Sequence, residues 1–222
     1  MRFLSVIFFA LFFSVLAQAQ SVRRLAQDVK LPTQGVIEQQ TVTNPIAASA
    51  TRIVTGAAGA TSAAEASLTT FSAQPDVPRN LTITPTGTTT DVESCVVTVT
   101  GTNIFDKVIT ETFSFAANAS TATTGNKAFK TVTNVAWAAS CESGSFGATW
   151  NIGVGEKLGL KRCMADAGGW LHSARDGVKE TTAATVAASA TAVESNTADV
   201  NGTMDGSTAF KFWFIQNYGC FP

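Results

Sequence analysis

QPDVPRNLTIT, residues 74–84, opens the stretch that decides the fold, which runs from Thr70 to Leu160. Four further runs in it alternate apolar or β-branched residues with threonine or charge: Ser94–Thr102, Ile109–Phe115, Asn126–Val135 and Gly153–Leu160. Period-two alternation between Gly, Asn, Asp and Pro turn signals is typical of half-buried antiparallel strands. The sequence therefore predicts an all-β fold, a jelly-roll-like antiparallel β-sandwich with an extended N-terminal arm.

The composition agrees with a β-sandwich and excludes one class of partner. The chain has 222 residues, 45% of them hydrophobic, which is enough for one sandwich with extensions. Its many threonines favour strands because their branched Cβ suits the pleat. Charged residues make up only 14% and the net charge is −1, so no basic face for nucleic acid is expected.

The first residues have the pattern of a secretory signal peptide. A positive start, Met1-Arg2, precedes an apolar run from Phe3 to Leu16, and Ala17-Gln18-Ala19 is a small-x-small cleavage signature. The apolar run is short for a membrane span. Cleavage would leave a secreted, extracellular protein that begins at Gln20 and has no membrane segment. Beyond the signal peptide (1–19), the predicted parts are an arm (20–69), the sandwich core (70–160) and C-terminal loops and strands that complete the sandwich (161–222).

The arm and the C-terminus suggest self-association. Two strand-like pieces, 36–42 and 50–54, could be the first strands of the sandwich or could pair with another subunit. The terminal run Phe210–Ile215 is apolar nearly throughout, which predicts burial on both faces or an exposed strand that joins subunits. The candidate self-assembly residues are Val36, Ile37, Val42, Ile53, Val54, Phe210, Phe212 and Phe214.

Four cysteines, Cys95, Cys141, Cys163 and Cys220, predict two disulfides in an oxidising compartment. Three pairings are possible. Cys95 opens a strand and Cys141 follows a nearby one, so neighbouring strands could join them and leave Cys163 for Cys220. A zinc site is rejected, because no two cysteines are close in sequence and His172 is the only histidine.

Three N-glycosylation sequons begin at Asn80, Asn118 and Asn201. Asn118 lies in the least structured loop and is the best candidate, whereas Asn80 opens a strand and is expected to be less accessible. The predicted partners are therefore covalent glycans and copies of the chain itself.

The strand runs also carry a family resemblance. The segments at 74–82, 97–103, 109–113, 127–133 and 153–160 resemble, in the same order, tailed-phage virion proteins of the head-fibre or decoration type. The resemblance covers residues 45 to 160 and extends more weakly to the C-terminus. It implies a structural β-sandwich module on a particle surface, without catalysis. The signal peptide, the cysteines and the sequons depart from that family and suggest a secreted form of such a module.

No catalytic or metal-binding pattern is evident. His172 has Trp170, Ser173, Arg175 and Asp176 as neighbours, but one loop rarely supplies a convergent nucleophile, base and orienting group. The acidic residues show neither the pairing of a glycosidase nor the spacing of a calcium site. The chain is therefore not expected to be an enzyme or to hold a cofactor.

Three functions remain. The first is a structural subunit that self-assembles into an extracellular filament or sheath through strand donation or stacking. The second is a surface decoration or fibre protein of a virus-like particle. The third is a secreted carbohydrate-binding sandwich that stacks sugars on Trp137, Trp150, Trp170 or Trp213. For the aromatic residues, packing in the core is the favoured interpretation because they alternate with polar or small positions. The filament subunit is the function that the sequence favours.

Overall fold

The computed structural model describes residues 36–58, 65–142, 147–217 and 220. These residues form antiparallel sheets joined by turns and short 3-10 segments, without an α-helix among them. The prediction of an all-β antiparallel sandwich is confirmed, whereas the finer jelly-roll arrangement stays a prediction. The proposed signal peptide (1–19) and the start of the arm (20–35) lie outside the described residues.

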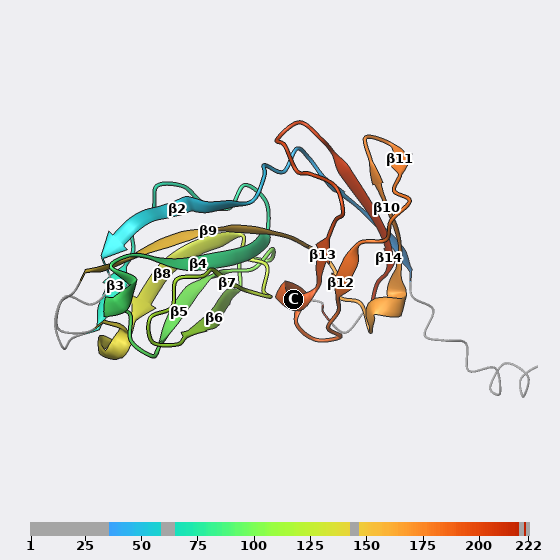
Figure 1. Cartoon of the computed structure of the whole chain (residues 1–222). Helices are drawn as coiled ribbons and strands as arrows, with labels where there is room; N and C mark the ends of the chain where they lie inside the picture. The colour runs from blue at the N-terminus through green and yellow to red at the C-terminus, as the bar shows by residue number, and fades with distance from the viewer. Residues whose placement is uncertain (1–35, 59–64, 143–146, 218–219, 221–222) are drawn as a thin grey trace, which may run out of the picture. The chain divides into compact units, whose positions relative to one another are not determined.

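A six-stranded sheet is organised around β9 (Ala148–Gly159), its longest strand. β4 (Arg79–Gly87) pairs along one edge of β9, while the other edge pairs with two strands in succession. The two strands on that other edge are β2 (Ser49–Ala58) and β13 (Thr197–Asp199). In Figure 1, β2, β9 and β4 lie side by side. The remaining strands of this sheet are β7 (Thr123–Thr124) and β12 (Thr185–Ala187).

A second sheet completes the sandwich. Its order is β3 (Ala66–Leu68), β8 (Thr131–Trp137), β5 (Cys95–Thr102) and β6 (Val108–Phe115). Two 3-10 segments occur near these strands in sequence: η1 (Thr89–Asp91) precedes β5, and η2 (Ala139–Cys141) follows β8. The core between the sheets includes Trp137 and Trp150, whose ring centroids are 6.4 Å apart. Phe113, Phe115 and Phe129 are buried there too. These aromatic residues therefore lie in the core, as the alternation predicts.

A third sheet joins the two ends of the described chain. Its order is β1 (Ile37–Val42), β14 (Phe210–Ile215), β10 (Trp170–Arg175) and β11 (Val178–Lys179). The short segments η3 (Ala167–Gly169) and η4 (Val193–Ser195) lie in the connections between the later strands. Phe210, Phe212 and Phe214 pack with Leu158 and other apolar residues in a second core. Because β9 contributes to both cores, one strand connects them.

The terminal strand differs from the prediction of burial on both faces. In β14 the side chains of Phe210, Phe212 and Phe214 are buried, but Lys211 and Trp213 are half-buried and Ile215 is exposed. The reason is that β14 has a core on one side only, so its residues alternate as in any half-buried strand. Nor is it an edge strand, because β1 and β10 pair with its two edges.

The described part of the arm folds onto its own chain. β1 pairs with β14 over six residues, β2 with β9, and β3 with β8. Further contacts fix β1: the Gln40 side chain donates to the carbonyl of Gly159 (2.9 Å), and Lys161 forms an ion pair with Glu38 (2.6 Å). Of the two possibilities left open by the sequence, the described structure thus has the arm supplying the first strands.

Arg79 is a fully buried cation at the start of β4. Its Nε donates to the carbonyl of Gly155 (2.7 Å), and its Nη1 donates to the carbonyl of Ile46 (2.9 Å) and to Asp76 (3.2 Å). Burial lowers the pKa of the Arg79 guanidinium, and the charge of Asp76 acts in the opposite direction. The side chain therefore ties β4 to β9 and to the segment that leaves β1.

Candidate functional site

The candidate self-assembly residues divide into buried and exposed groups. Val42, Ile53, Val54, Phe210, Phe212 and Phe214 are buried within this chain. Val36 and Ile37 are exposed by 48% and 61%. Only the second group therefore presents apolar surface to solvent in the folded chain.

Two more exposed apolar residues lie at the same end of the third sheet. Ile215 pairs with Ile37 across β14 and β1, and Leu171 follows Trp170, which pairs with Phe214. Ile215 and Leu171 are exposed by 36% and 43%. We call Val36, Ile37, Leu171 and Ile215 the end patch. The sequence missed its last two members, because Ile215 was counted in a buried strand and Leu171 in a loop.

The end patch adjoins an open strand edge. Among the described strands β1 is the outermost of its sheet, with β14 on one side, and the carbonyl of Gln39 accepts a hydrogen bond from Lys161 Nζ (2.8 Å). The backbone amide of Gln216 donates to the carbonyl of Val36 (3.0 Å), which extends the pairing by one residue past Ile37. An edge strand presents unpaired N–H and C=O groups on its free side, which is a template for another strand. Apolar surface and a pairing edge thus coincide at β1.

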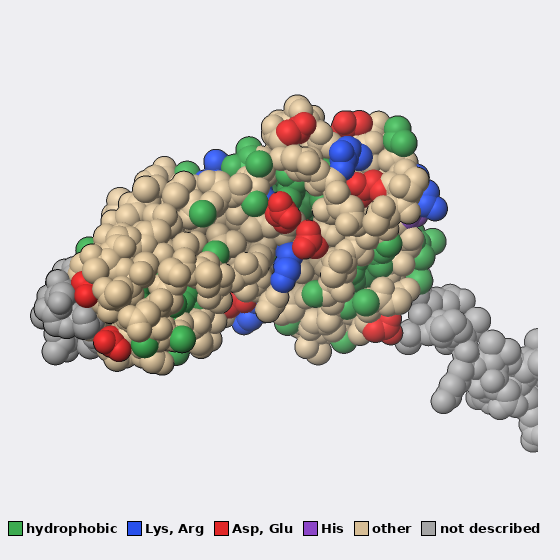
Figure 2. Space-filling view, viewed as in Figure 1, with side chains coloured by type: hydrophobic (Ala, Val, Ile, Leu, Met, Phe, Trp, Pro, Cys, Tyr) green, Lys and Arg blue, Asp and Glu red, His purple; other side chains and the backbone are tan. Residues whose placement is uncertain are grey.

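Charge is sparse over the surface as well as in the composition. Figure 2 shows few Lys, Arg, Asp and Glu side chains, scattered over a face that is mostly uncharged. Four ion pairs occur among the described residues, and two of them, Lys161 with Glu38 and Arg175 with Glu180, lie at the third sheet. Long-range repulsion between copies of such a chain is weak.

The four tryptophans pack against other rings of the chain. Trp137 and Trp150 are buried together, and Trp170 packs against Phe212 with centroids 5.3 Å apart. Trp213 stacks on His172 across β14 and β10, at 4.4 Å and an interplanar angle of 15°. An indole that offers a free face is what sugar stacking needs, and each of these rings already has an aromatic neighbour.

The residues around His172 do not converge. His172 stacks on Trp213, whereas the next residue, Ser173, donates its hydroxyl hydrogen bond to Glu180. Neighbouring residues of a strand point to opposite faces, which separates this histidine from this serine. Arg175 also turns toward Glu180, with 3.6 Å between Nη2 and Oε1. Among the described residues no cluster of three or more His, Cys, Asp and Glu could hold a metal ion.

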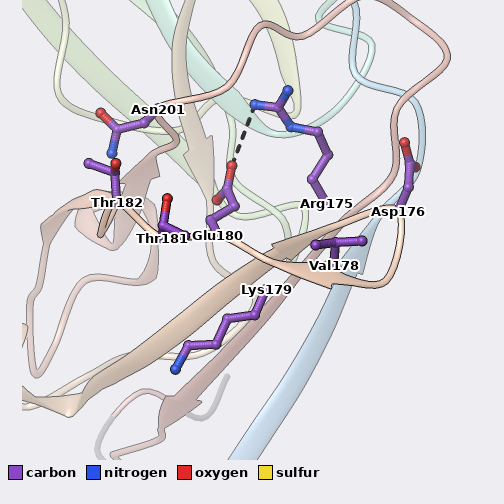
Figure 3. A pocket seen from close by; sticks show the side chains of 8 residues that line it. All are labelled: Arg175, Asp176, Val178, Lys179, Glu180, Thr181, Thr182 and Asn201. Carbon is purple, nitrogen blue, oxygen red and sulfur yellow. Dashed lines mark ion pairs between the residues drawn. The ribbon is translucent and has the colours of Figure 1, made fainter.

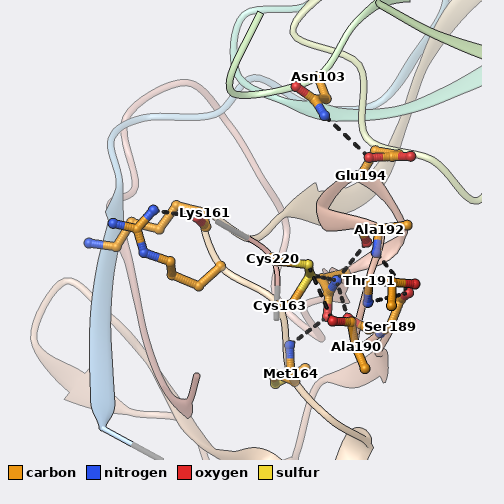
Figure 4. The surroundings of a disulfide bond; sticks show 12 residues. Asn103, Lys161, Cys163, Met164, Ser189, Ala190, Thr191, Ala192, Glu194 and Cys220 are labelled. Carbon is orange, nitrogen blue, oxygen red and sulfur yellow. Dashed lines mark hydrogen bonds between the residues drawn. A yellow bond between two sulfur atoms is a disulfide. The ribbon is translucent and has the colours of Figure 1, made fainter. Parts of the chain in front are cut away.

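The two disulfides have the pairing that the strand positions favoured. Cys95 is joined to Cys141 and Cys163 to Cys220, with Cα–Cα distances of 4.8 and 5.6 Å. Such bonds form and persist in oxidising environments. Figure 4 shows the second disulfide beside the segment from Ser189 to Ala192. Within the described residues, no helix has the length and hydropathy that a bilayer span requires.

The buried amide of Asn196 fixes the surroundings of the second disulfide. Its Nδ2 donates to the carbonyls of Ser189 (2.9 Å) and Ala192 (2.8 Å) and contacts the sulfur of Cys163 at 3.3 Å. Its Oδ1 accepts from the backbone amide of Met164 (2.9 Å). A fully buried amide that satisfies both its donors and its acceptor orders the segments it joins.

The three sequons have different environments. Asn80 is fully buried; its Nδ2 donates to the carbonyl of Gly125 (3.1 Å) and its Oδ1 accepts from the amide of Lys157 (2.9 Å). A glycan on Asn80 is incompatible with this fold, because no space surrounds the amide. Asn118 is exposed in a turn at φ 58°, and Asn201 is exposed in the loop after β13.

The carboxylate of Asp205 organises the loop that follows Asn201, and it makes the stability of the protein depend on pH. Asp205 accepts hydrogen bonds from the backbone amides of Ser207 and Thr208, both at 2.9 Å, which lower the pKa of Asp205 below its usual value. Its stabilising effect is therefore present above the unfolded-state pKa, about 3.9, and is lost as the pH falls through the folded-state pKa.

We expect Asp205→Asn to reduce the loss of stability on acidification. The amide keeps an oxygen acceptor for the two backbone amides but does not titrate in this range. The measurement is the urea midpoint of both proteins from pH 6 to pH 2, with Glu65→Gln as a control for the loss of one exposed carboxylate. If Asp205→Asn and the wild type lose stability equally on acidification, the ionised Asp205 carboxylate does not stabilise the folded protein.

Comparison with protein families, curated proteins and solved structures gives no match to this chain. The likeness to tailed-phage virion proteins thus stays an expectation from the sequence blocks. The function of the chain is inferred from its own residues.

Proposed function

We propose that the protein is a secreted structural subunit that self-associates into an extracellular filament or sheath, without catalysis. The observation that carries the proposal is the end patch beside the open edge of β1. Four large aliphatic side chains are exposed there, two of them paired across neighbouring strands. Exposed apolar side chains beside a strand edge, on a protein of low charge, commonly mark a contact with another protein.

The size of the patch favours repeated weak contacts over one tight dimer. Covering roughly 300 Å² of apolar surface at ~25 cal/mol per Å² contributes about 7 kcal/mol. Association costs about 4–15 kcal/mol in lost freedom, so one such contact leaves little net affinity. Pairing of β1 with a strand of a second copy adds backbone hydrogen bonds to the apolar contact. A polymer, in which each subunit makes such contacts on more than one side, gains from their number.

We expect Ile37→Lys to weaken self-association by tenfold or more, since burying one unpaired charge exceeds the ~1.4 kcal/mol that a factor of ten requires. The measurement is light scattering with electron microscopy of the secreted protein. Val108→Lys is the matched control, because Val108 is 74% exposed at the start of β6, in another sheet and outside the end patch.

A charge-pair experiment makes this test sharper. Ile37→Lys and Ile37→Glu are each expected to stay dissociated, and an equal mixture is expected to recover association if the patches of two copies face each other. A wild-type protein that remains monomeric at high concentration would refute the proposal. So would an Ile37→Lys variant that assembles like the wild type.

A further inference from the structure

The loop that carries Asn201 borders a cavity of about 580 Å³. The opposite wall is the β10–β11 hairpin, whose turn residues Asp176 and Gly177 have φ angles of 47° and 85°. An Asp-Gly pair with two positive φ angles makes the tight turn that suits a two-residue hairpin loop. Figure 3 shows Asn201 next to Thr182, with Glu180 and Arg175 across the space from them.

The side chain of Arg175 lies next to the sequon at the rim of this cavity. The guanidinium of Arg175 lies so close to Gly202 that a Cβ at position 202 would overlap it. The same side chain forms its ion pair with Glu180 on the cavity wall. The loop therefore lies directly against the end of the Arg175 side chain. On the other side of the loop, Asn201 Nδ2 donates to the carbonyl of Ala183.

The cavity wall matches the two-sided chemistry of a sugar ring. The hydroxyls of Thr181 and Thr182 and the carboxylate of Glu180 can bond to sugar hydroxyl or N-acetyl groups. Val178 supplies an apolar surface that is 72% exposed. A sugar ring has apolar C–H faces and polar edges, so one ring can cover the valine and satisfy the polar groups together.

We propose that Asn201 is an N-glycosylation site and that its first N-acetylglucosamine occupies this cavity. The transfer forms a bond between Nδ2 and C1 of the sugar and breaks the bond from C1 to the diphosphate of a lipid-linked oligosaccharide donor. The lipid diphosphate leaves with the electron pair of that bond, and the amide loses one proton. The N–H that remains on Nδ2 still donates to the carbonyl of Ala183.

A glycan at Asn201 differs from one at Asn118 in its contact with the wall of this cavity. Asn118 is exposed in a turn and is not among the residues that line this cavity. A sugar on Asn118 is therefore expected to project into solvent. The two sequons form a matched pair, of which only Asn201 borders this cavity.

The test uses the full chain secreted from cultured eukaryotic cells, analysed by glycopeptide mass spectrometry and by enzymatic release of glycans from the folded protein. We expect Asn201 to be occupied and its glycan to be released about tenfold more slowly than that of Asn118, because release requires the loop to open. An unmodified Asn201, or release at the same rate as from Asn118, would overturn the proposal.

Two variants separate the sugar from the asparagine side chain. Asn201→Gln removes both the glycan and the bond to Ala183, whereas Thr203→Ala removes the glycan and keeps Asn201. We expect both variants to melt about 2–4 °C lower than the glycosylated protein and Asn118→Gln to melt unchanged. If Thr203→Ala melts like the wild type, the sugar does not contact the cavity and the proposal is wrong.

Discussion

Replacing Arg79 with leucine is expected to lower the free energy of unfolding by about 3–5 kcal/mol, the usual cost of breaking a buried charged pair. The substitution removes the donors that reach the carbonyls of Gly155 and Ile46 and leaves Asp76 without its cation. Buried acceptors without partners keep their full desolvation cost. The measurement is urea unfolding of the purified protein, followed by tryptophan fluorescence.

Arg52→Leu is the control for this prediction. Arg52 donates from Nε to the carbonyl of Gln74 at 3.1 Å, in an exposed setting, so its loss is expected to cost less than about 1 kcal/mol. Arg79→Lys tests the geometry of the site, since an ammonium group lacks the fork that reaches two carbonyls and a carboxylate together. An Arg79→Lys protein as stable as the wild type would show that charge alone suffices.

Replacing Cys95 and Cys141 with alanine is expected to cost about 4 kcal/mol, from the entropy of closing a loop of this length in the unfolded chain. The two cysteines are 46 residues apart and join the start of β5 to η2. Both are buried, so the alanines also lose some packing. Urea unfolding with and without reductant measures the two contributions separately.

Full reduction supplies the control for the disulfide prediction. When the wild-type disulfides are reduced, the entropic part of the difference between Cys95→Ala/Cys141→Ala and the wild type disappears. A remaining gap of about 1 kcal/mol or less is what the lost side-chain atoms explain. If most of the difference survives reduction, the bond contributes through packing and the entropic prediction fails.

Much of the sandwich could be predicted because its signals are local. Alternation located β4, β5, β6 and β8, and the aromatic residues among them fill the first core. The second core depends on the pairing of β1 with β14, between residues 37–42 and 210–215. A period of two indicates a strand and does not name its partner, so the sequence left open where the arm belongs.

The candidate sites were less accessible to sequence reasoning. Val36 and Ile37 could be named from their apolar character, but Leu171 and Ile215 join them only through strand register. The sequon triplet marks Asn80, Asn118 and Asn201 alike, although one is buried, one lies in a turn and one borders a cavity. That distinction depends on contacts with Gly125 and with Arg175 that are distant in sequence.

The pairing of early strands with late ones determines when the chain can close. Among the described strands β2 pairs only with β9 (148–159). Before β9 is synthesised, β4 has only the two-residue β7 and a single bridge to Phe129, and β1 must wait for residues 210–215. Pairing between such distant segments makes folding slow. Docking of β1 covers β14 last. Until then the phenylalanine strand is open to the β1 of any neighbouring chain, so chains that fold at high concentration are expected to exchange this strand.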